Sequence, residues 1–194
     1  MRSSGLVLDS PAMPRSLRAL LPVLLLLAVG AAGCGGGSGS PDETSATGTA
    51  TPAQSAAQTV DAIARRISPK LSERPRIPAP QGQPPSRLIA KDVVRGTGKP
   101  VRQGQVVQVQ YVGASWSTGK EFDASWNRGQ AFSFPLGGGQ VIPGWDKGVV
   151  GMRPGGRRLL VITPDLGYGA QGTPDGSIAP NETLLFVIDL QQAK

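Results

Sequence analysis

Hydrophobic and polar residues alternate at several places in the C-terminal half of the chain. The runs at 107–111, 132–136 and 184–190 place an apolar residue at every second position. Alternation with a period of two is typical of a β-strand that buries one face. A further run, 159–162, is apolar at every position, which indicates a strand covered on both faces. The pattern predicts four or five antiparallel strands.

Turn-forming residues and one helical segment complete this pattern. Glycine, proline and aspartate interrupt the strands and predict turns at 118–120, 137–139, 154–156 and 174–176. Near residues 144–150 the spacing is helical, because Pro143 precedes Trp145 and Val149, which are four residues apart. Such a helix would cover the apolar face of the sheet. The expected fold class is therefore α+β, with a twisted antiparallel sheet of about five strands wrapped on one short α-helix.

Residues 1–33 have the pattern of a signal peptide of the lipoprotein type. Arg15 and Arg18 precede an apolar stretch at 19–30, and small residues follow it. The stretch is shorter than the roughly twenty residues that a transmembrane helix needs. The pattern predicts an exported protein, and the alternative is a signal anchor that stays uncleaved.

Cys34 is the single cysteine of the chain and directly follows the small residues. Residues 31–34, with the sequence AAGC, resemble a bacterial lipobox, in which the cysteine is lipidated and becomes the mature N-terminus. The resemblance implies that the lipid on Cys34 attaches the protein to the membrane. The expected location is the outer face of the cytoplasmic membrane.

The segment 34–85 is rich in glycine, serine, threonine and proline, and its composition predicts a flexible tether. Its first half has no apolar periodicity, so it cannot bury enough surface to offset its ordering entropy. Val60, Ile63 and Ile67 have helical spacing, which predicts one short helix over 59–68 that would be marginal alone in water. The expected organisation is a signal peptide, a tether and a folded domain, at 1–33, 34–85 and 86–194.

The composition excludes several classes of active site. The chain has no histidine and one cysteine, so a Ser-His-Asp triad, a Cys-His pair and a His-ligated zinc site are impossible. We expect no metal and no cofactor. Asp165 and Asp175 have no acid–base partner and are expected to be turn residues. The formal net charge of +7 is spread out, with no basic run longer than Arg157-Arg158, and a nucleic-acid partner is therefore not expected.

Five separated segments resemble the FKBP family of peptidyl-prolyl cis-trans isomerases. They keep the order and spacing of the family across residues 88–191, and they read VQYVG (109–113), GKEFDASWNRGQAFSFPLG (119–137), VIPGWDKGVVGM (141–152), PDLGYGAQG (164–172) and IAPNETLLFVIDL (178–190). The resemblance implies an FKBP-like fold and an enzyme that accelerates rotation about X-Pro bonds in secreted or envelope proteins. The implied partners are proline-containing polypeptides and FKBP-directed macrolides.

The resemblance also implies which residues form the site. Trp145 would be the apolar floor beneath the proline ring, and the Tyr168 hydroxyl would donate to a substrate carbonyl. Asp123 would lie at the pocket edge, held by Arg128 or Tyr111. The implied catalytic residues are Tyr111, Phe122, Asp123, Trp145, Tyr168 and Phe186, and the implied substrate-binding residues are Arg128, Phe132, Val141, Ile142 and Ile178.

Such a pocket needs neither an acid nor a base, which agrees with the absence of histidine. A planar amide is more polar than its twisted transition state, so an apolar site disfavours the planar form relative to the twisted one. The alternative function is a binding module, in which the same pocket holds a proline-bearing partner without useful turnover. A structural envelope lipoprotein is a third possibility, but it would not require this pocket.

Overall fold

The computed structural model describes residues 52–194, so the predicted signal peptide, Cys34 and the first part of the predicted tether lie outside the described residues. The helices are α1 (Pro52–Arg66) and α2 (Pro143–Gly148), with short 3-10 helices at Ser125–Arg128 and Pro164–Leu166. The strands are β1 (Ile89–Val94), β2 (Val106–Ser115), β3 (Glu121–Ala124), β4 (Phe132–Pro135), β5 (Gly156–Ile162) and β6 (Leu184–Ala193).

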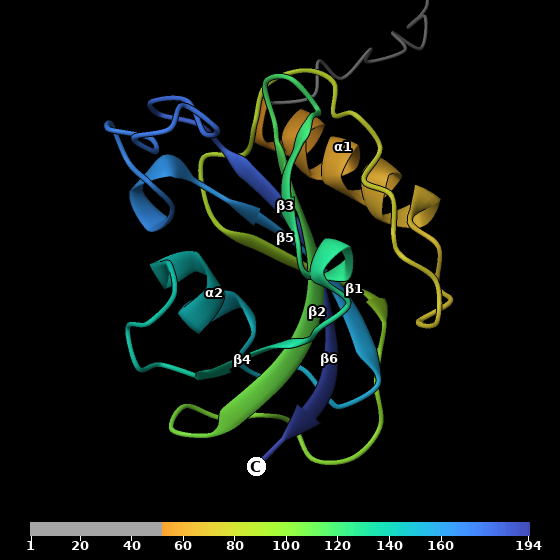
Figure 1. Cartoon of the computed structure of the whole chain (residues 1–194). Coiled ribbons are helices and arrows are strands. Elements are labelled where there is room, and N and C mark those ends of the chain that lie inside the picture. Colours follow the sequence, from red (N-terminus) through yellow and green to blue (C-terminus); the bar gives the residue numbers. More distant parts are fainter. Residues whose placement is uncertain (1–51) are drawn as a thin grey trace, which may run out of the picture. The chain divides into compact units, whose positions relative to one another are not determined.

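All six strands belong to one antiparallel sheet (Figure 1). Their order is β1-β5-β6-β2-β3, and β4 pairs with β2 beyond the end of β3. The long strands β2 and β6 form the centre, where Tyr111 lies opposite Ile188 and Gly113 opposite Phe186. The predicted α+β class is confirmed, with six strands where about five were expected.

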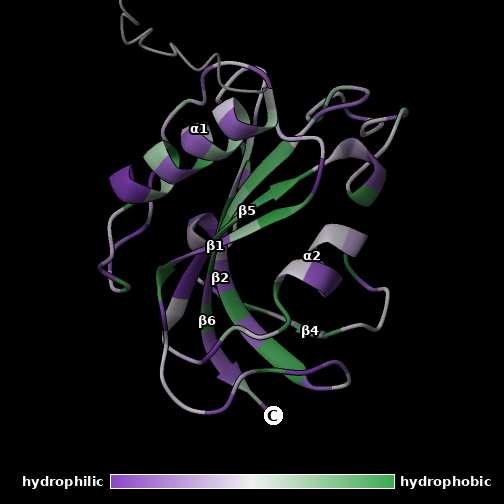
Figure 2. Cartoon of the chain, turned by 180° about the vertical axis from the view of Figure 1, so that it is seen from behind, coloured by the Kyte–Doolittle hydropathy of each residue, from purple (hydrophilic) through white to green (hydrophobic). Residues whose placement is uncertain are grey.

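The sheet buries both of its faces, and consecutive residues of β5 point to opposite sides. Leu160 and Ile162 belong to the apolar cluster that contains α2, whereas Leu159 and Val161 belong to the cluster that contains α1. All four side chains are fully buried. Figure 2 shows hydrophobic residues along β5 and β2, and a mixture of hydrophobic and hydrophilic residues along α1. We call the α2 side the inner face and the α1 side the outer face.

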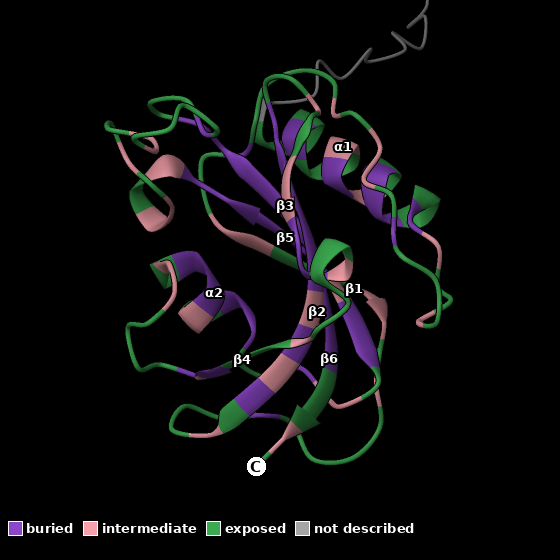
Figure 3. Ribbon diagram, in the orientation of Figure 1, coloured by how far each residue is buried: buried purple, intermediate pink, exposed green. Residues whose placement is uncertain are grey.

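The outer face corrects one prediction. Residues 34–85 were expected to form a flexible tether, but the described part from residue 52 packs against the sheet. Val60, Ile63 and Ile67 are almost completely buried there, and buried and exposed residues alternate along α1 (Figure 3). The helix also begins before the predicted 59–68. A lone helix of this length is marginal in water, and tertiary packing of its apolar face stabilises it.

A buried arginine forms hydrogen bonds to the segment that follows α1. We call this segment, residues 67–88, the strap. Arg157 is completely buried on β5 and forms a bidentate ion pair with Asp189 on β6, at 2.5 and 2.6 Å. Two of its other N–H groups donate to the backbone oxygens of Ser68, at 2.5 Å, and Glu73, at 2.9 Å. Further along the strap, Trp116 Nε1 donates to the Gly82 oxygen at 3.1 Å. These hydrogen bonds fix the conformation of the strap on the surface of the domain.

Residues 52–194 contain neither a helix that could span a membrane nor a side-chain cluster that could hold a metal ion. Within this range, no helix has both the length and the apolar character needed to cross a membrane. The same residues bring together no group of three or more histidine, cysteine, aspartate or glutamate side chains that could hold a metal ion.

Candidate active site

Two glycines allow α2 to lie directly on β5 at the inner face. A Cβ on Gly144 would lie 2.4 Å from Ile162 Cγ2, and one on Gly148 would lie 2.8 Å from the methyl carbons of Leu160. Any larger residue would push the helix away from the sheet. Pro143 occupies the first turn, where its missing N–H leaves no hydrogen bond unmade. This close approach places Trp145 on the apolar face of the sheet.

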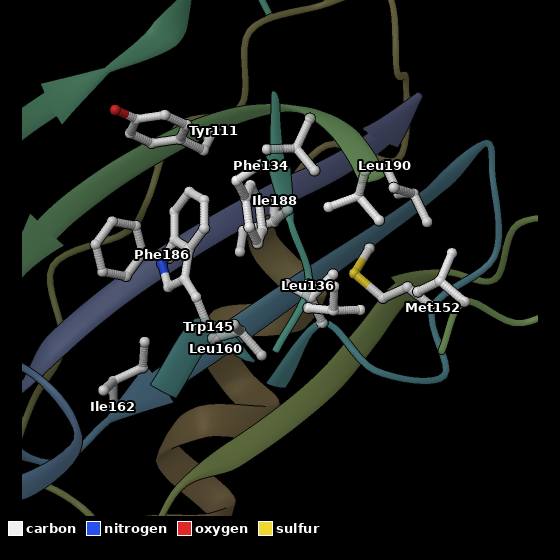
Figure 4. Close-up of a cluster of buried hydrophobic side chains, with 14 of the residues drawn as sticks. Tyr111, Phe134, Leu136, Trp145, Met152, Leu160, Ile162, Phe186, Ile188 and Leu190 are labelled. Carbon is white, nitrogen blue, oxygen red and sulfur yellow. The ribbon is translucent and has the colours of Figure 1, made fainter. Parts of the chain in front are cut away.

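Trp145 lies at the centre of a group of aromatic rings. Its ring centroid is 5.0 Å from that of Tyr111 and 5.2 Å from that of Phe186, and both pairs meet edge to face. Figure 4 shows the three rings together at one side of the aliphatic core. Phe122 extends the group by packing edge-on against Phe186 at 5.5 Å. Edge-to-face contacts add stability beyond the area they bury, so the rings hold one another in place.

Gly113 on β2 makes room for two of these rings. A Cβ at this position would lie 2.7 Å from a ring carbon of Phe186 and 2.8 Å from ring carbons of Phe122. The VQYVG segment therefore contributes both the ring of Tyr111 and the space that its neighbours need.

The aromatic group opens into a cavity of about 670 Å³ on the inner face. Ten of the eleven residues that the resemblance assigns to the site line it, and Gly139, Gln140, Thr173, Asp175 and Ser177 line it as well. Arg128 is the exception. It contacts the side chains of Asp123 and Tyr111 and does not belong to the lining.

Tyr111, Asp123 and Arg128 form a hydrogen-bonded triangle at the cavity edge. The Tyr111 hydroxyl donates to Asp123 Oδ2, and Arg128 donates to Asp123 Oδ1 and to the Tyr111 hydroxyl oxygen, each at 2.7 Å. The sequence left open which of the two partners holds Asp123, and the structure uses both. The triangle fixes the ring of Tyr111 at its polar end, while Trp145 packs against its side.

The same triangle keeps the protonation states constant near neutral pH. Partial burial opposes ionisation of Asp123, but the hydrogen bonds from Tyr111 and Arg128, with the charge of Arg128, outweigh it and lower the pKa of the carboxyl group. Burial, together with the hydrogen bond to Asp123, raises the pKa of Tyr111 to about 12. Asp123 is therefore a carboxylate and Tyr111 a neutral phenol over the physiological range.

Tyr168 provides a hydrogen-bond donor at the cavity mouth. Its side chain is 40% exposed, and its hydroxyl has no protein partner within residues 52–194. Burial of the ring, followed by the negative charges of Asp123 and Asp175, raises the pKa of its hydroxyl, which therefore keeps its proton. A phenol that carries its proton and faces a cavity can donate to a bound carbonyl.

The loop between the Pro164–Leu166 helix and β6 forms the other side of the mouth. Ile178 is 3% exposed and belongs to the inner core, and its N–H donates to Thr173 Oγ1 at 2.9 Å. The turn from Thr173 to Ser177 lies between these two points. From the sequence, Asp175 was expected to be a turn residue, and Thr173 and Ser177 were not among the expected site residues, because the pattern of a turn does not show which way its side chains face.

Comparisons with known proteins agree with this geometry. A family model described as FKBP-type peptidyl-prolyl cis-trans isomerase matches residues 97–191. An "FK506-binding protein" from Streptomyces anulatus is 55% identical over 118 residues, which cover 61% of this chain and 95% of the relative. A "Probable FK506-binding protein" from Corynebacterium glutamicum is 46% identical over 121 residues, which cover 62% of this chain and 99% of the relative.

A solved structure shares the fold as well. The crystal structure of AtFKBP13 superposes with a TM-score of 0.52 at 38% sequence identity, over 55% of this chain and 93% of that chain. The family-model match begins after β1, so α1 and the strap lie outside it.

Proposed function

The chain belongs to the FKBP-type peptidyl-prolyl cis-trans isomerase family, and from this premise we propose that it accelerates rotation about X-Pro bonds in secreted or envelope proteins. The reaction takes place in the inner-face cavity, without acid–base or covalent chemistry. The observation that carries it is the aromatic cavity itself, which has Trp145 beneath it and Tyr111, Phe122 and Phe186 around it.

Rotation about an X-Pro bond requires little more than such a cavity. Rotation is slow because it breaks amide resonance, with a barrier of about 18–20 kcal/mol. The apolar rings replace the water that stabilises the planar, polar amide. The twisted form is less polar, so it loses less stabilisation when the water is replaced. Donors that hold the flanking carbonyls restrict motion to one bond. An acceleration of roughly 10³–10⁵ requires only about 4–7 kcal/mol.

Three polar residues at the cavity contribute to this mechanism. The Tyr168 hydroxyl donates to a substrate carbonyl, and Asp123 holds Tyr111 as a fixed wall. Arg128 acts through Asp123 and Tyr111 and is a positioning residue, because it contacts both side chains and does not line the cavity. Ile142, Val141 and Phe132 form the apolar rim on which we expect the residue before proline to lie.

Exchange spectroscopy on a Leu-Pro peptide tests the function directly. The full chain is expected to accelerate cis-trans exchange, and FK506 is expected to compete for the cavity, by analogy with the names of the relatives. Trp145→Ala should abolish both effects. A protein that binds the peptide but does not accelerate exchange would support the binding-module alternative and contradict the proposed activity.

We also propose that the isomerase is exported and anchored by lipid on Cys34, which lies outside the described residues. Support comes from the signal-peptide pattern and the lipobox-like residues 31–34. One acyl chain gives only marginal membrane binding, so stable anchoring would use the two chains of a diacylglyceryl group. Cys34→Ala should release the protein from membranes or leave its precursor uncleaved. Unchanged processing and membrane retention would rule the proposal out.

A further inference from the structure

The charged groups that line the cavity are both acidic. Asp123 and Asp175 contribute carboxylates to its wall, and among residues 52–194 no lysine or arginine belongs to the lining. This is unexpected in a chain whose formal net charge is +7. The local charge at the mouth therefore has the opposite sign to the protein as a whole.

The two carboxylates differ in how their charge is compensated. Asp123 forms an ion pair with Arg128 at 2.7 Å and accepts a hydrogen bond from Tyr111. Asp175 takes part in none of the ion pairs found within residues 52–194. Its charge is therefore the uncompensated one at the cavity mouth.

Hydrogen bonds inside its own turn hold Asp175 in place. Both the N–H and the hydroxyl of Ser177 donate to Asp175 Oδ1, at 3.1 and 2.8 Å. The hydrogen bond from Thr173, followed by those from Ser177, lowers the pKa of the Asp175 carboxyl, which is ionised at neutral pH. A carboxylate that is already held in position loses little side-chain entropy when a cation binds.

The charge of Asp175 also acts where a substrate would lie. The negative charges of Asp123 and Asp175 both contribute to the raised pKa of the Tyr168 hydroxyl, the group assigned to a substrate carbonyl. Tyr168 and Asp175 line the same cavity. A peptide whose carbonyl reaches Tyr168 therefore carries its neighbouring side chains into the field of Asp175.

We propose that Asp175 is a specificity-determining residue that favours polypeptides with lysine or arginine within two residues of the proline. The inference rests on the proposed function, since it names the substrate class of the same cavity. Exposed ion pairs are weak, so the expected preference is modest, about two- to fivefold in kcat/KM over a neutral residue. It should decrease with salt, because the screening length falls from about 10 Å at 0.1 M to about 3 Å at 1 M.

The test uses two peptide series with leucine before proline. Lysine, glutamine or glutamate is placed before the leucine in one series and after the proline in the other. Exchange spectroscopy with the full chain gives kcat/KM for each peptide without a protease, and each protein is normalised to its own glutamine peptide. We expect the order lysine, glutamine, glutamate in at least one series, with ratios near one at 1 M salt.

Two variants assign the preference to one carboxylate. Asp175→Asn keeps an oxygen for the Ser177 donors and removes the charge, and it should bring the normalised lysine and glutamate ratios close to one. Asp165→Asn is the matched control, because Asp165 is an exposed aspartate that does not line the cavity. It should retain the wild-type ratios. If it loses the preference to the same extent, the net charge of the protein is responsible and the inference is wrong.

The outcomes also separate this inference from the proposed function. No acceleration of the glutamine peptides would contradict the proposed function itself. Normal acceleration with equal rates for lysine and glutamate peptides in both series would overturn the role of Asp175 alone. A preference that survives in Asp175→Asn would overturn it as well.

Discussion

The two faces of the sheet are each covered by one helix, but the coverings differ in kind. On the outer face, α1 lays valine, isoleucine and alanine side chains on the valines and leucines of β5 and β6. On the inner face, the shorter α2 brings Trp145 onto a group of aromatic rings that stays open to a cavity. Phe186 and Val187 are adjacent on β6 and belong to opposite faces.

This difference shows how one sheet can be closed on one side and functional on the other. Aliphatic side chains adapt to each other and fill the space under α1. The rings around Trp145 are rigid and hold each other edge to face, so the space beside them does not collapse. The outer face therefore contributes stability, whereas the inner face is less completely covered and forms a binding site where it stays open.

Removal of the outer cover should have the largest effect. A chain starting at residue 86 loses α1 and residues 67–85 of the strap. It exposes the outer-face leucines and valines and leaves two donors of Arg157 without acceptors. Burial of each large aliphatic side chain contributes about 1.5–3 kcal/mol. We therefore expect the free energy of unfolding, measured by urea denaturation, to fall by at least about 4 kcal/mol, or the shortened chain to aggregate. A chain starting at residue 46 is the control. Equal stability of the two proteins would contradict the role of the outer layer.

Ile63→Ala tests the outer face with a single substitution. Ile63 is 4% exposed in the outer cluster, and truncation of such a residue costs about 2–5 kcal/mol. The free energy of unfolding should fall by this amount, while kcat/KM of the folded protein stays within about twofold. Gln58→Ala, on the exposed side of α1, should change stability by no more than about 0.5 kcal/mol. A large loss of kcat/KM in Ile63→Ala would show that the two faces are not independent.

Phe122→Ala should produce the opposite result. Phe122 is only half-buried and packs against Phe186 at the cavity wall. We expect kcat/KM to fall on the order of tenfold to a hundredfold, about 1.4–2.7 kcal/mol, with a smaller loss of unfolding free energy than in Ile63→Ala. Thermal unfolding and exchange kinetics on the same sample separate these quantities. A drop in stability without a drop in activity would place Phe122 in the core and outside the site.

Tyr168→Phe should have a smaller effect on the inner face. The ring stays, and one hydrogen bond to a substrate carbonyl is lost, which costs on the order of 1 kcal/mol or about fivefold in kcat/KM. Stability should not change, because the hydroxyl has no protein partner within residues 52–194. A loss of a hundredfold would assign Tyr168 a larger role than positioning.

A change of pH should have the smallest effect on kcat/KM. The pKa of Asp123 is lowered and that of Tyr111 is raised to about 12, so neither group changes charge between about pH 5.5 and 8.5. The contribution of ionised Asp123 is complete above its unfolded pKa of about 4 and is lost only as pH falls through the lower folded value. We expect kcat/KM to be flat across this range. A bell-shaped profile centred near neutrality would contradict the mechanism.

Much of the inner face could be predicted from the sequence because its signals are local. Alternation at 107–111 and 184–190 predicted the central strands β2 and β6, and Pro143 with Trp145 predicted α2. The site residues followed from the family resemblance, and the structure brings all but Arg128 to the cavity wall. The edge strands β1 and β3 gave no clear alternation, since no residue of β1 is fully buried and β3 is very short.

The sequence by itself determined that the strand at 159–162 is covered on both faces, and only the tertiary structure decided what covers the second one. The spacing of Val60, Ile63 and Ile67 is visible in the sequence, but a short helix is stable only where it finds an apolar surface. That surface comes from residues far along the chain. The position of Asp175 at the cavity mouth likewise depends on how the loop folds back over the sheet. Both features depend on contacts between segments that are distant in the sequence, and a local sequence pattern does not show such contacts.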